Sequence, residues 1–253
     1  MKFETPIRRA LAFLLASSLT AFAGTSAADK KDKQKPAANQ TIDSGSFGIF
    51  IKGQRVATET FHIEQQAGNS IIKSQLKDTS GSDSSQKSDL ELNSNGELLR
   101  YEWSQSSGGS LSVFPDNEFL KERISTSTSS KPAEQPFLLP AVTPILDNNF
   151  FIHREVLAWK YLNAVCQPAG VDTKCRQESA DFGTLVPQDR TSMSVRISLG
   201  GKEKVTIRGV ERDLLRLNLH GDQFDWALWV DDHDHFKLIK VAIPADNTEV
   251  VRD

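Results

Sequence analysis

Five consecutive residues, Asp231-Asp232-His233-Asp234-His235, have the types and spacing that come closest to a reactive site. Carboxylates and imidazoles are ligands for divalent cations. His233 and His235 lie two positions apart, so on a strand both would point to the same face. Aspartate is also a common turn former, and the same residues fit a solvated hairpin turn. The sequence therefore predicts either a metal site at Asp231, His233 and His235, or a turn between two strands.

The motifs of common enzyme classes do not occur in the mature chain. Serines are plentiful, but none stands in a G-x-S-x-G pattern. A Walker loop, a G-x-G-x-x-G run and an H-E-x-x-H motif are equally missing from the sequence. The spacings do not bring a nucleophile, a base and an orienting group together. We therefore expect no enzyme and no cofactor, with a hydrolase or metal-dependent enzyme that uses His233 and His235 as the alternative.

The two cysteines of the chain, Cys166 and Cys175, enclose a short segment that contains Pro168 and Gly170. An isolated pair of cysteines in an exported protein usually oxidises, and this segment can fold back on itself. A redox-active pair would need the closer C-x-x-C spacing. The sequence predicts a structural disulfide between Cys166 and Cys175.

Aromatic residues are the candidates for binding a ligand. Most of them fit an ordinary core, because aromatic side chains dominate cores. Phe50 and Trp229 stand on the parity opposite the apolar face of their strands. Either the sheet is covered on both sides there, or an apolar patch is open to a partner. We expect Phe50, Phe151, Trp159 and Trp229 to line a hydrophobic site between helix and sheet.

Alternation of apolar and polar residues predicts strands over most of the body. The pattern is clearest at Met193–Leu199 and Leu215–Leu219. Gly200-Gly201 and Asn95-Gly96 predict turns, because these residues tolerate positive φ. The Ser/Thr-rich stretch 125–136 predicts a loop. About ten short strands are expected in total.

One helix is expected, over Asn148–Asn163, with Asp147 as its N-terminal cap. Its apolar stripe is interrupted by Glu155. A single helix among many strands does not fit a parallel α/β sheet. The expected fold class is mainly β (α+β), a single curved antiparallel sheet or split barrel with one helix packed across the concave face.

The N-terminal region predicts export. Positive residues precede the apolar run Leu11–Ala16, and two clusters of small residues, Ala21–Gly24 and Thr25–Ala28, each fit a cleavage site. We interpret residues 1–27 as a signal peptide, 28–44 as a disordered tether and 45–253 as one β-rich exported domain. The expected location is the periplasm, with secretion as the alternative. No transmembrane segment is expected in the mature chain.

Charge excludes one class of partner. The chain of 253 residues has a formal net charge of −3, although the signal region and the lysine-containing tether are both positive. The β-rich body is therefore acidic. Nucleic-acid binding needs a clustered positive field, so we expect no nucleic-acid partner.

Four segments carry a resemblance to known proteins. They are Gly48–Thr60, Val205–Leu217, Gly221–Asp231 and Phe236–Val241. Their tryptophan-rich strand, Val-Asp turn and Leu-x-Lys strand resemble uncharacterised families of bacterial exported proteins. In outline these families are similar to the curved-sheet-plus-helix fold of the periplasmic lipoprotein carriers and receptors. The resemblance implies a concave apolar surface able to hold an acyl chain.

These observations lead to one functional expectation and two alternatives. We expect a non-enzymatic periplasmic binding or scaffold module that holds a lipid or other hydrophobic ligand between sheet and helix. The first alternative is a structural component that docks another envelope protein. The second is the enzyme that would use the His233 and His235 cluster.

Overall fold

A computed structural model describes residues 39–79, 84–126, 131–169 and 172–253. The chain divides into two units, 1–35 and 36–253, and all the described residues belong to the second unit. The predicted signal peptide therefore lies outside the described residues, as does most of the predicted tether. Within the described ranges, no helix combines the length and the apolarity needed to cross a bilayer.

The second unit is built from strands, with one α-helix and two single-turn 3-10 helices in the described ranges. The first group of strands is β1 (Gln40–Ile51), β2 (Gln54–Gln66), β3 (Asn69–Asp78), β4 (Ser85–Leu92), β5 (Leu98–Gln105), β6 (Gly109–Asp116), β7 (Phe119–Thr126) and β8 (Ala133–Phe137). Helix α1 (Ile152–Val165) follows, and then β9 (Cys166–Ala169), β10 (Asp172–Cys175), β11 (Ala180–Val186) and η1 (Pro187–Asp189). The last elements are β12 (Thr191–Ile207), β13 (Val210–Gly221), β14 (Phe224–Asp231), β15 (Lys237–Ile243), η2 (Pro244–Asp246) and β16 (Thr248–Arg252).

Fourteen of these strands form one antiparallel sheet in the order β11-β12-β13-β14-β15-β16-β1-β2-β3-β4-β5-β6-β7-β8. Each half of the sheet is a meander of neighbouring strands, as the short turns between them favour. The two meanders join where β1 pairs with β16, with Phe47 opposite Arg252. The sheet does not close into a barrel, because β8 and β11 remain its two edges. This architecture confirms the predicted single antiparallel sheet with one helix.

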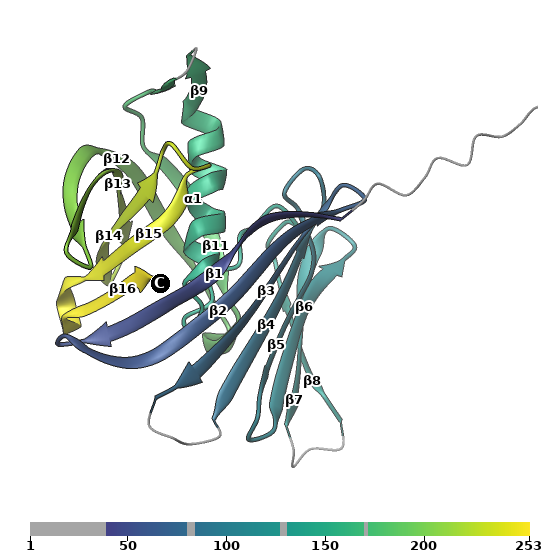
Figure 1. Cartoon of the computed structure of the whole chain (residues 1–253). Helices are drawn as coiled ribbons and strands as arrows, with labels where there is room; N and C mark the ends of the chain where they lie inside the picture. Colours follow the sequence, from purple (N-terminus) through teal and green to yellow (C-terminus); the bar gives the residue numbers. More distant parts are fainter. Residues whose placement is uncertain (1–38, 80–83, 127–130, 170–171) are drawn as a thin grey trace, which may run out of the picture. The chain divides into compact units, whose positions relative to one another are not determined.

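Helix α1 lies between the two halves of the sheet (Figure 1). We call the side of the sheet that faces α1 the inner face, and the opposite side the outer face. Apolar residues of the helix and of both halves form one continuous core. Ile152, Leu157 and Leu162 are among the helix side chains that this core buries almost completely. The core therefore fixes the halves to each other through the helix.

Three predictions about the strands and their connections differ from the structure. Strand β1 begins at Gln40, before the predicted domain start at residue 45, because Thr41 and Asp43 already pair with β2. Gly200-Gly201 is not a turn: β12 continues through it with a shift in register, and Gly201 takes a φ of +97°. The predicted loop 125–136 contains the end of β7 and most of β8. A glycine pair in a strand pattern can thus mark a bulge as well as a turn.

The helix begins later than predicted, and Asp147 does not cap it. Helix α1 starts at Ile152. Its N-cap residue is Phe151, whose side chain makes no capping hydrogen bond. The carboxylate of Asp147 instead accepts a hydrogen bond from the backbone N–H of Asn149 at 2.7 Å. This local bond competes with the helical backbone pattern and keeps the preceding residues non-helical.

A buried group of charges lies at the junction of the two halves. The Arg252 guanidinium contacts the carboxylates of Asp43 on β1 and Glu155 on α1, the latter at 3.1 Å. Its Nε also donates to the backbone carbonyl of Leu238 at 2.8 Å. Burial alone would raise the pKa of Asp43, but the hydrogen bonds and positive charge of Arg252 hold that pKa below its usual value. Arg252 therefore connects β16, β1, β15 and the helix.

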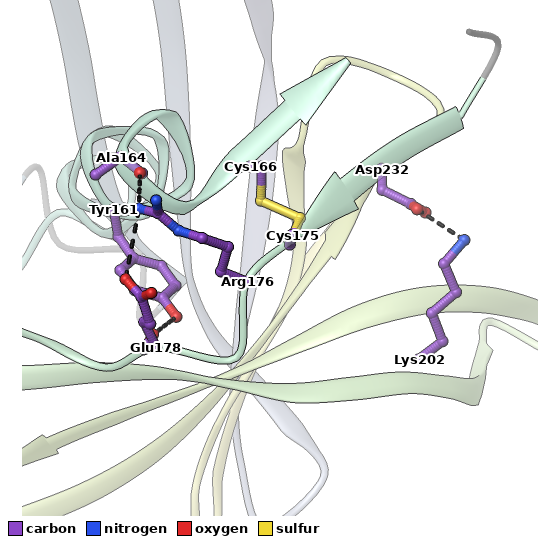
Figure 2. Close-up of a disulfide and its surroundings, with 8 residues drawn as sticks. All are labelled: Tyr161, Ala164, Cys166, Cys175, Arg176, Glu178, Lys202 and Asp232. Atoms are coloured by element: carbon purple, nitrogen blue, oxygen red, sulfur yellow. Dashed lines mark hydrogen bonds and ion pairs between the residues drawn. A yellow bond between two sulfur atoms is a disulfide. The ribbon is translucent and has the colours of Figure 1, made fainter. Parts of the chain in front are cut away.

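The predicted disulfide is confirmed. Cys166 and Cys175 face each other on the two-stranded ribbon of β9 and β10, and their sulfur atoms are bonded. Figure 2 shows this bond directly after the end of α1. Arg176, the next residue, returns to the helix and donates to the carbonyl of Ala164 at 3.0 Å. The disulfide thus closes a short ribbon that is attached to the last turn of α1.

Replacing Arg252 by methionine should destabilise the fold strongly. Asp43 would keep only Lys237 at 3.7 Å as a cationic partner, and Glu155 would keep none among the described residues, so the free energy of unfolding should fall by about 3 kcal/mol. Urea unfolding at neutral pH measures this loss. The matched control is Arg196→Met, because Arg196 makes a two-bonded ion pair with Asp181 on the exposed surface. That control should change stability little, and an equally small effect of Arg252→Met would contradict the role given to the buried group.

The variant Cys166→Ser/Cys175→Ser should fold but melt at a lower temperature. Opening so short a loop restores chain entropy to the unfolded state, which amounts to about 2–3 kcal/mol in the chain-entropy model. Thermal unfolding followed by circular dichroism measures the change. The unaltered chain under a reducing agent should show the same loss. A reduced chain as stable as the oxidised one would show that the disulfide contributes nothing.

Candidate functional site

A large hollow lies on the outer face of the first half of the sheet. It crosses β2 to β7 and has a volume of about 760 Å³. We call it the outer trough. No helix residue lines it, because α1 covers the opposite face. The trough is open to solvent and is therefore accessible to a ligand without any movement of the core.

Two rows of polar side chains form the trough, and the antiparallel register aligns them across the strands. The first row is His62, Lys73, Asp89, Glu102, Ser112 and Arg123. The second row is Thr60, Gln75, Lys87, Ser104, Ser110 and Ser125. Neighbouring strands are spaced by about 4.8 Å, so six strands give rows of roughly 24 Å. The serine side chains on β5 to β7 are small, so they project only a short distance from the sheet.

The charges of the trough are mixed. The ammonium groups of Lys73 and Lys87 make no ion pair with a described residue, whereas Arg123 pairs with Glu134 at 2.8 Å. Asp89 stands between Lys73 and Glu102 in its row, and its Oδ1 is buried without a hydrogen-bond partner. Burial raises the pKa of Asp89, and the positive charges of Arg100 and Lys73 offset part of this effect. The trough therefore offers two ammonium groups that have no ion-pair partner within the part of the chain that the structure describes.

A second group of polar residues lies beneath the start of α1. The Glu59 carboxylate on β2 accepts hydrogen bonds from the backbone N–H groups of Phe151 at 2.6 Å and Ile152 at 3.2 Å. Ser74 donates to the same carboxylate at 2.7 Å. Glu59 is completely buried, and burial raises its pKa to about 7 in spite of these bonds. A carboxylate from a distant strand thus caps the helix, where negative charge is favourable.

The same layer contains buried side chains from the loop before the helix and from η1. The hydroxyl of Tyr101 donates to Asp147, and the amide of Gln188 donates to both. Arg154 donates to the backbone carbonyls of Asp147 and Phe150. Burial lowers the pKa of His153 to about 4, so its imidazole is neutral at neutral pH. A perturbed pKa is typical of functional sites, but these groups are closed off from solvent and hold the helix in place.

The predicted metal residues occupy a turn between β14 and β15. Asp231 accepts from the backbone N–H of His233 at 3.0 Å and pairs with Arg212 at 2.9 Å. Each of the next two aspartates also has a lysine partner, Asp232 with Lys202 (Figure 2) and Asp234 with Lys237. Among the described residues, no three histidine, cysteine or acidic side chains gather closely enough to hold a metal ion. The arrangement favours the turn, because the carboxylates are already paired with cations.

The four aromatic residues predicted to bind a ligand have separate partners. The Arg55 guanidinium lies over the ring of Phe50 at 5.7 Å, and that of Arg154 lies over Phe151 at 5.1 Å. The indole of Trp159 donates to the carbonyl of Phe236 at 3.0 Å. Trp229 packs against a small outer cluster of Ile207, Leu214 and Ile239. The sheet is therefore covered on both sides at Trp229, and none of the four lines the outer trough.

Comparison with known proteins identifies no relative. No family model, no curated protein and no solved structure matches this chain. The resemblance to exported-protein families therefore remains a prediction, and the case for a function rests on the geometry of this chain alone.

The sequence patterns indicated neither the outer trough nor the buried polar layer. The trough residues were visible as the polar positions of alternating strands, but only the register shows which of them stand side by side. The sequence did contain an indication that Glu59 is buried, because Glu59 shares its parity with Phe61 and Ile63, which are buried. A charged residue on the apolar parity of a strand indicates a buried partner elsewhere.

The Glu59→Gln variant should change how stability depends on pH. A carboxyl whose pKa rises from 4.5 unfolded to about 7 folded stabilises the fold fully below pH 4.5, and this contribution is lost as the pH rises through 7. Between pH 5 and 8, the free energy of unfolding of the unaltered chain should therefore fall by about 2–3 kcal/mol relative to the variant. Urea unfolding of both proteins at the two pH values measures this difference. Glu118→Gln, at an exposed turn position, is the control, and parallel curves for Glu59→Gln and the unaltered chain would refute the assignment.

Proposed function

We propose that this chain is an exported, non-enzymatic binding module that holds an extended acidic polysaccharide in the outer trough. The observation that carries the proposal is the pair of aligned polar rows across β2 to β7. A trough about five strand spacings long fits an extended chain better than a compact small molecule. The predicted signal peptide and the disulfide support export to an oxidising compartment.

The side chains of the trough support the choice of ligand. Serine and threonine hydroxyls both donate and accept hydrogen bonds, as do the hydroxyls of a sugar. Asp89 and Glu102, which both line the trough, would accept from sugar hydroxyls. Lys73 and Lys87 stand diagonally across β3 and β4 and would pair with carboxylate groups on the polymer. A chain that carries hydroxyls together with carboxylates satisfies all of these groups.

The trough needs no rearrangement of the fold before a ligand binds. Its side chains project from strands whose inner residues belong to the core, so the surface is rigid before a ligand arrives. A preformed surface loses little conformational entropy on binding. A non-enzymatic role is consistent with a site whose polar residues lie along an open face, where water is not excluded from a bound ligand.

The double variant Lys73→Ala/Lys87→Ala should weaken binding of polygalacturonate at least tenfold, since two ammonium–carboxylate contacts are removed. Isothermal titration calorimetry in 150 mM salt, with dextran as the neutral polymer, measures the effect on the mature chain. Ser110→Tyr should also weaken binding, because its ring would fill the low part of the trough without changing charge. The unaltered protein should prefer polygalacturonate to dextran.

The control is Lys174→Ala/Lys204→Ala, which removes two exposed lysines outside the trough. An equal loss of affinity in this control would show that binding is a non-specific charge effect, and absence of binding to polygalacturonate would refute the proposal. Native mass spectrometry of protein purified from its own host tests the hydrophobic-ligand hypothesis separately. A bound acyl mass would favour a ligand between helix and sheet over the polysaccharide.

A further inference from the structure

A small cavity lies between the single turn η1 and the inner face of β5 to β7. Its volume is about 220 Å³. Trp103, Leu111 and Ile124 line it from the sheet. Pro187, the first residue of η1, and Arg190, the residue that follows η1, line it from the other side. The wall therefore combines an indole ring and aliphatic side chains with one guanidinium group.

This cavity and the outer trough share part of their lining. Trp103, Ser110, Leu111 and Ser125 belong to both. Successive side chains of a strand point to opposite faces of the sheet. Ser110 and Ser125 stand opposite each other in an outer row, whereas Leu111 is buried in the core on the inner face. The two hollows therefore lie back to back with the sheet between them, and one ligand does not occupy both.

The guanidinium group of Arg190 makes no ion pair and no hydrogen bond with a described residue. The neighbouring carboxylate of Asp189 accepts from the side-chain amide of Asn148 at 2.6 Å instead. Glu122, which is buried on β7, is close enough to feel the charge of Arg190, but burial raises the pKa of Glu122 to about 7. At pH 6 Glu122 is therefore mostly neutral and leaves the positive charge of Arg190 to a ligand.

The backbone conformation of Arg190 is one that arginine rarely adopts. Its φ of 53° and ψ of 39° lie in the left-handed region, where asparagine and aspartate are enriched several-fold over other residues with a side chain. A residue in such a conformation directs attention to what its side chain does.

A second connection in the same sheet shows which residue this turn favours. Val186–Thr191 and Ile243–Thr248 have the same pattern of an apolar residue, proline, any residue, aspartate, any residue and threonine. Both connect neighbouring antiparallel strands through one 3-10 turn. The residue equivalent to Arg190 is Asn247, with a φ of 53° and a ψ of 42°. The backbone of the turn therefore suits asparagine, and the arginine in the first connection is explained by its side chain, which faces the cavity.

The turn that carries Arg190 is fixed to the sheet before any ligand binds. The side-chain amide of Gln188 donates to the hydroxyl of Tyr101 at 3.1 Å and to the carboxylate of Asp147. Pro187 is buried. Because η1 is already ordered, a ligand that binds beside it loses little free energy to the ordering of the turn.

The sheet side of the cavity favours an apolar group. The indole N–H of Trp103 already donates to Gln86 at 3.0 Å, so its ring offers apolar surface to a ligand. Leu111 and Ile124 stand opposite each other on β6 and β7 and present aliphatic side chains. Apolar groups gain free energy when they are buried against such a wall, and an aromatic ring also packs well against an indole.

We propose that this cavity binds a small monocarboxylate with a compact apolar group. The carboxylate pairs with Arg190, and the apolar group packs against Trp103, Leu111 and Ile124. A guanidinium group matches a carboxylate with two parallel hydrogen bonds. The cavity is smaller than most drug-sized sites, which limits the ligand to one ring or a short alkyl chain. This ligand is distinct from the polysaccharide of the outer trough, so the inference does not rest on the proposed function.

The experiment compares three small molecules that separate the two parts of the site. Benzoate has both the charge and the ring, benzyl alcohol has a similar shape without the charge, and acetate has the charge without the ring. Titrations of the mature chain are followed by NMR chemical shifts at pH 6, where carboxylates are ionised. Benzoate should bind at least tenfold more tightly than benzyl alcohol and than acetate.

The decisive variant is Arg190→Asn, which makes the first connection resemble the second. Its affinity for benzoate should fall at least tenfold, to that of benzyl alcohol. Its melting temperature at pH 6 should not fall, because asparagine suits the left-handed backbone better than arginine does. A merely structural role of Arg190 would give the opposite result, a lower melting temperature. Arg196→Asn, which changes an exposed arginine outside the cavity, is the matched control and should bind benzoate like the unaltered chain.

Two cross-tests separate this site from the outer trough. Lys73→Ala/Lys87→Ala should bind benzoate as the unaltered chain does, and Arg190→Asn should keep its affinity for polygalacturonate. If polygalacturonate does not bind but benzoate does, the proposed function fails and this inference stands. Equal affinity for benzoate and benzyl alcohol, unchanged benzoate binding by Arg190→Asn, loss of benzoate binding in the double lysine variant, or no binding of benzoate by the unaltered chain would overturn the inference.

Discussion

The contact of Arg252 with Asp43 and Glu155 is the interaction on which the rest of the structure depends. It lies where the first strand of the sheet meets the last, and it reaches the helix from there. The Arg252 guanidinium also lies over the rings of Phe47 and Phe61 at 5.5 and 5.0 Å. Ion pairs at such a depth are costly to form, but their geometry allows one arrangement only. The group therefore specifies how the two meanders join.

The interior combines apolar packing with fixed polar contacts. Ile152 and Leu157 fill the space between the halves, while Glu59 caps the helix and Glu155 binds the backbone N–H of Leu238 at 2.9 Å. These polar contacts give the helix one position and one rotation, which apolar packing alone would define less sharply. The interior therefore holds the strands rigidly, and this fixes the positions of the two polar rows of the outer trough.

The two faces of the first half of the sheet have different chemistry. The outer face carries the open trough with its hydroxyls and lysines, whereas the inner face belongs to the apolar core that includes α1. Successive side chains of a strand point to opposite faces of the sheet, so two neighbouring residues can lie in these two environments. A single strand such as β7 can thus line the trough through Arg123 and face the interior through Glu122 and Ile124.

The sequence by itself determined the strand-rich class, the lone helix and the disulfide, because alternation, turn residues and cysteine spacing are local signals. It could not determine where the helix starts, since the cap comes from Glu59, far away along the chain. Nor could it align Lys73 with Asp89, or place Gln188 against Tyr101, because register and the path of η1 decide those neighbours. The tertiary structure alone made these choices, since contacts between distant residues depend on how strands pair and not on the type of any single residue.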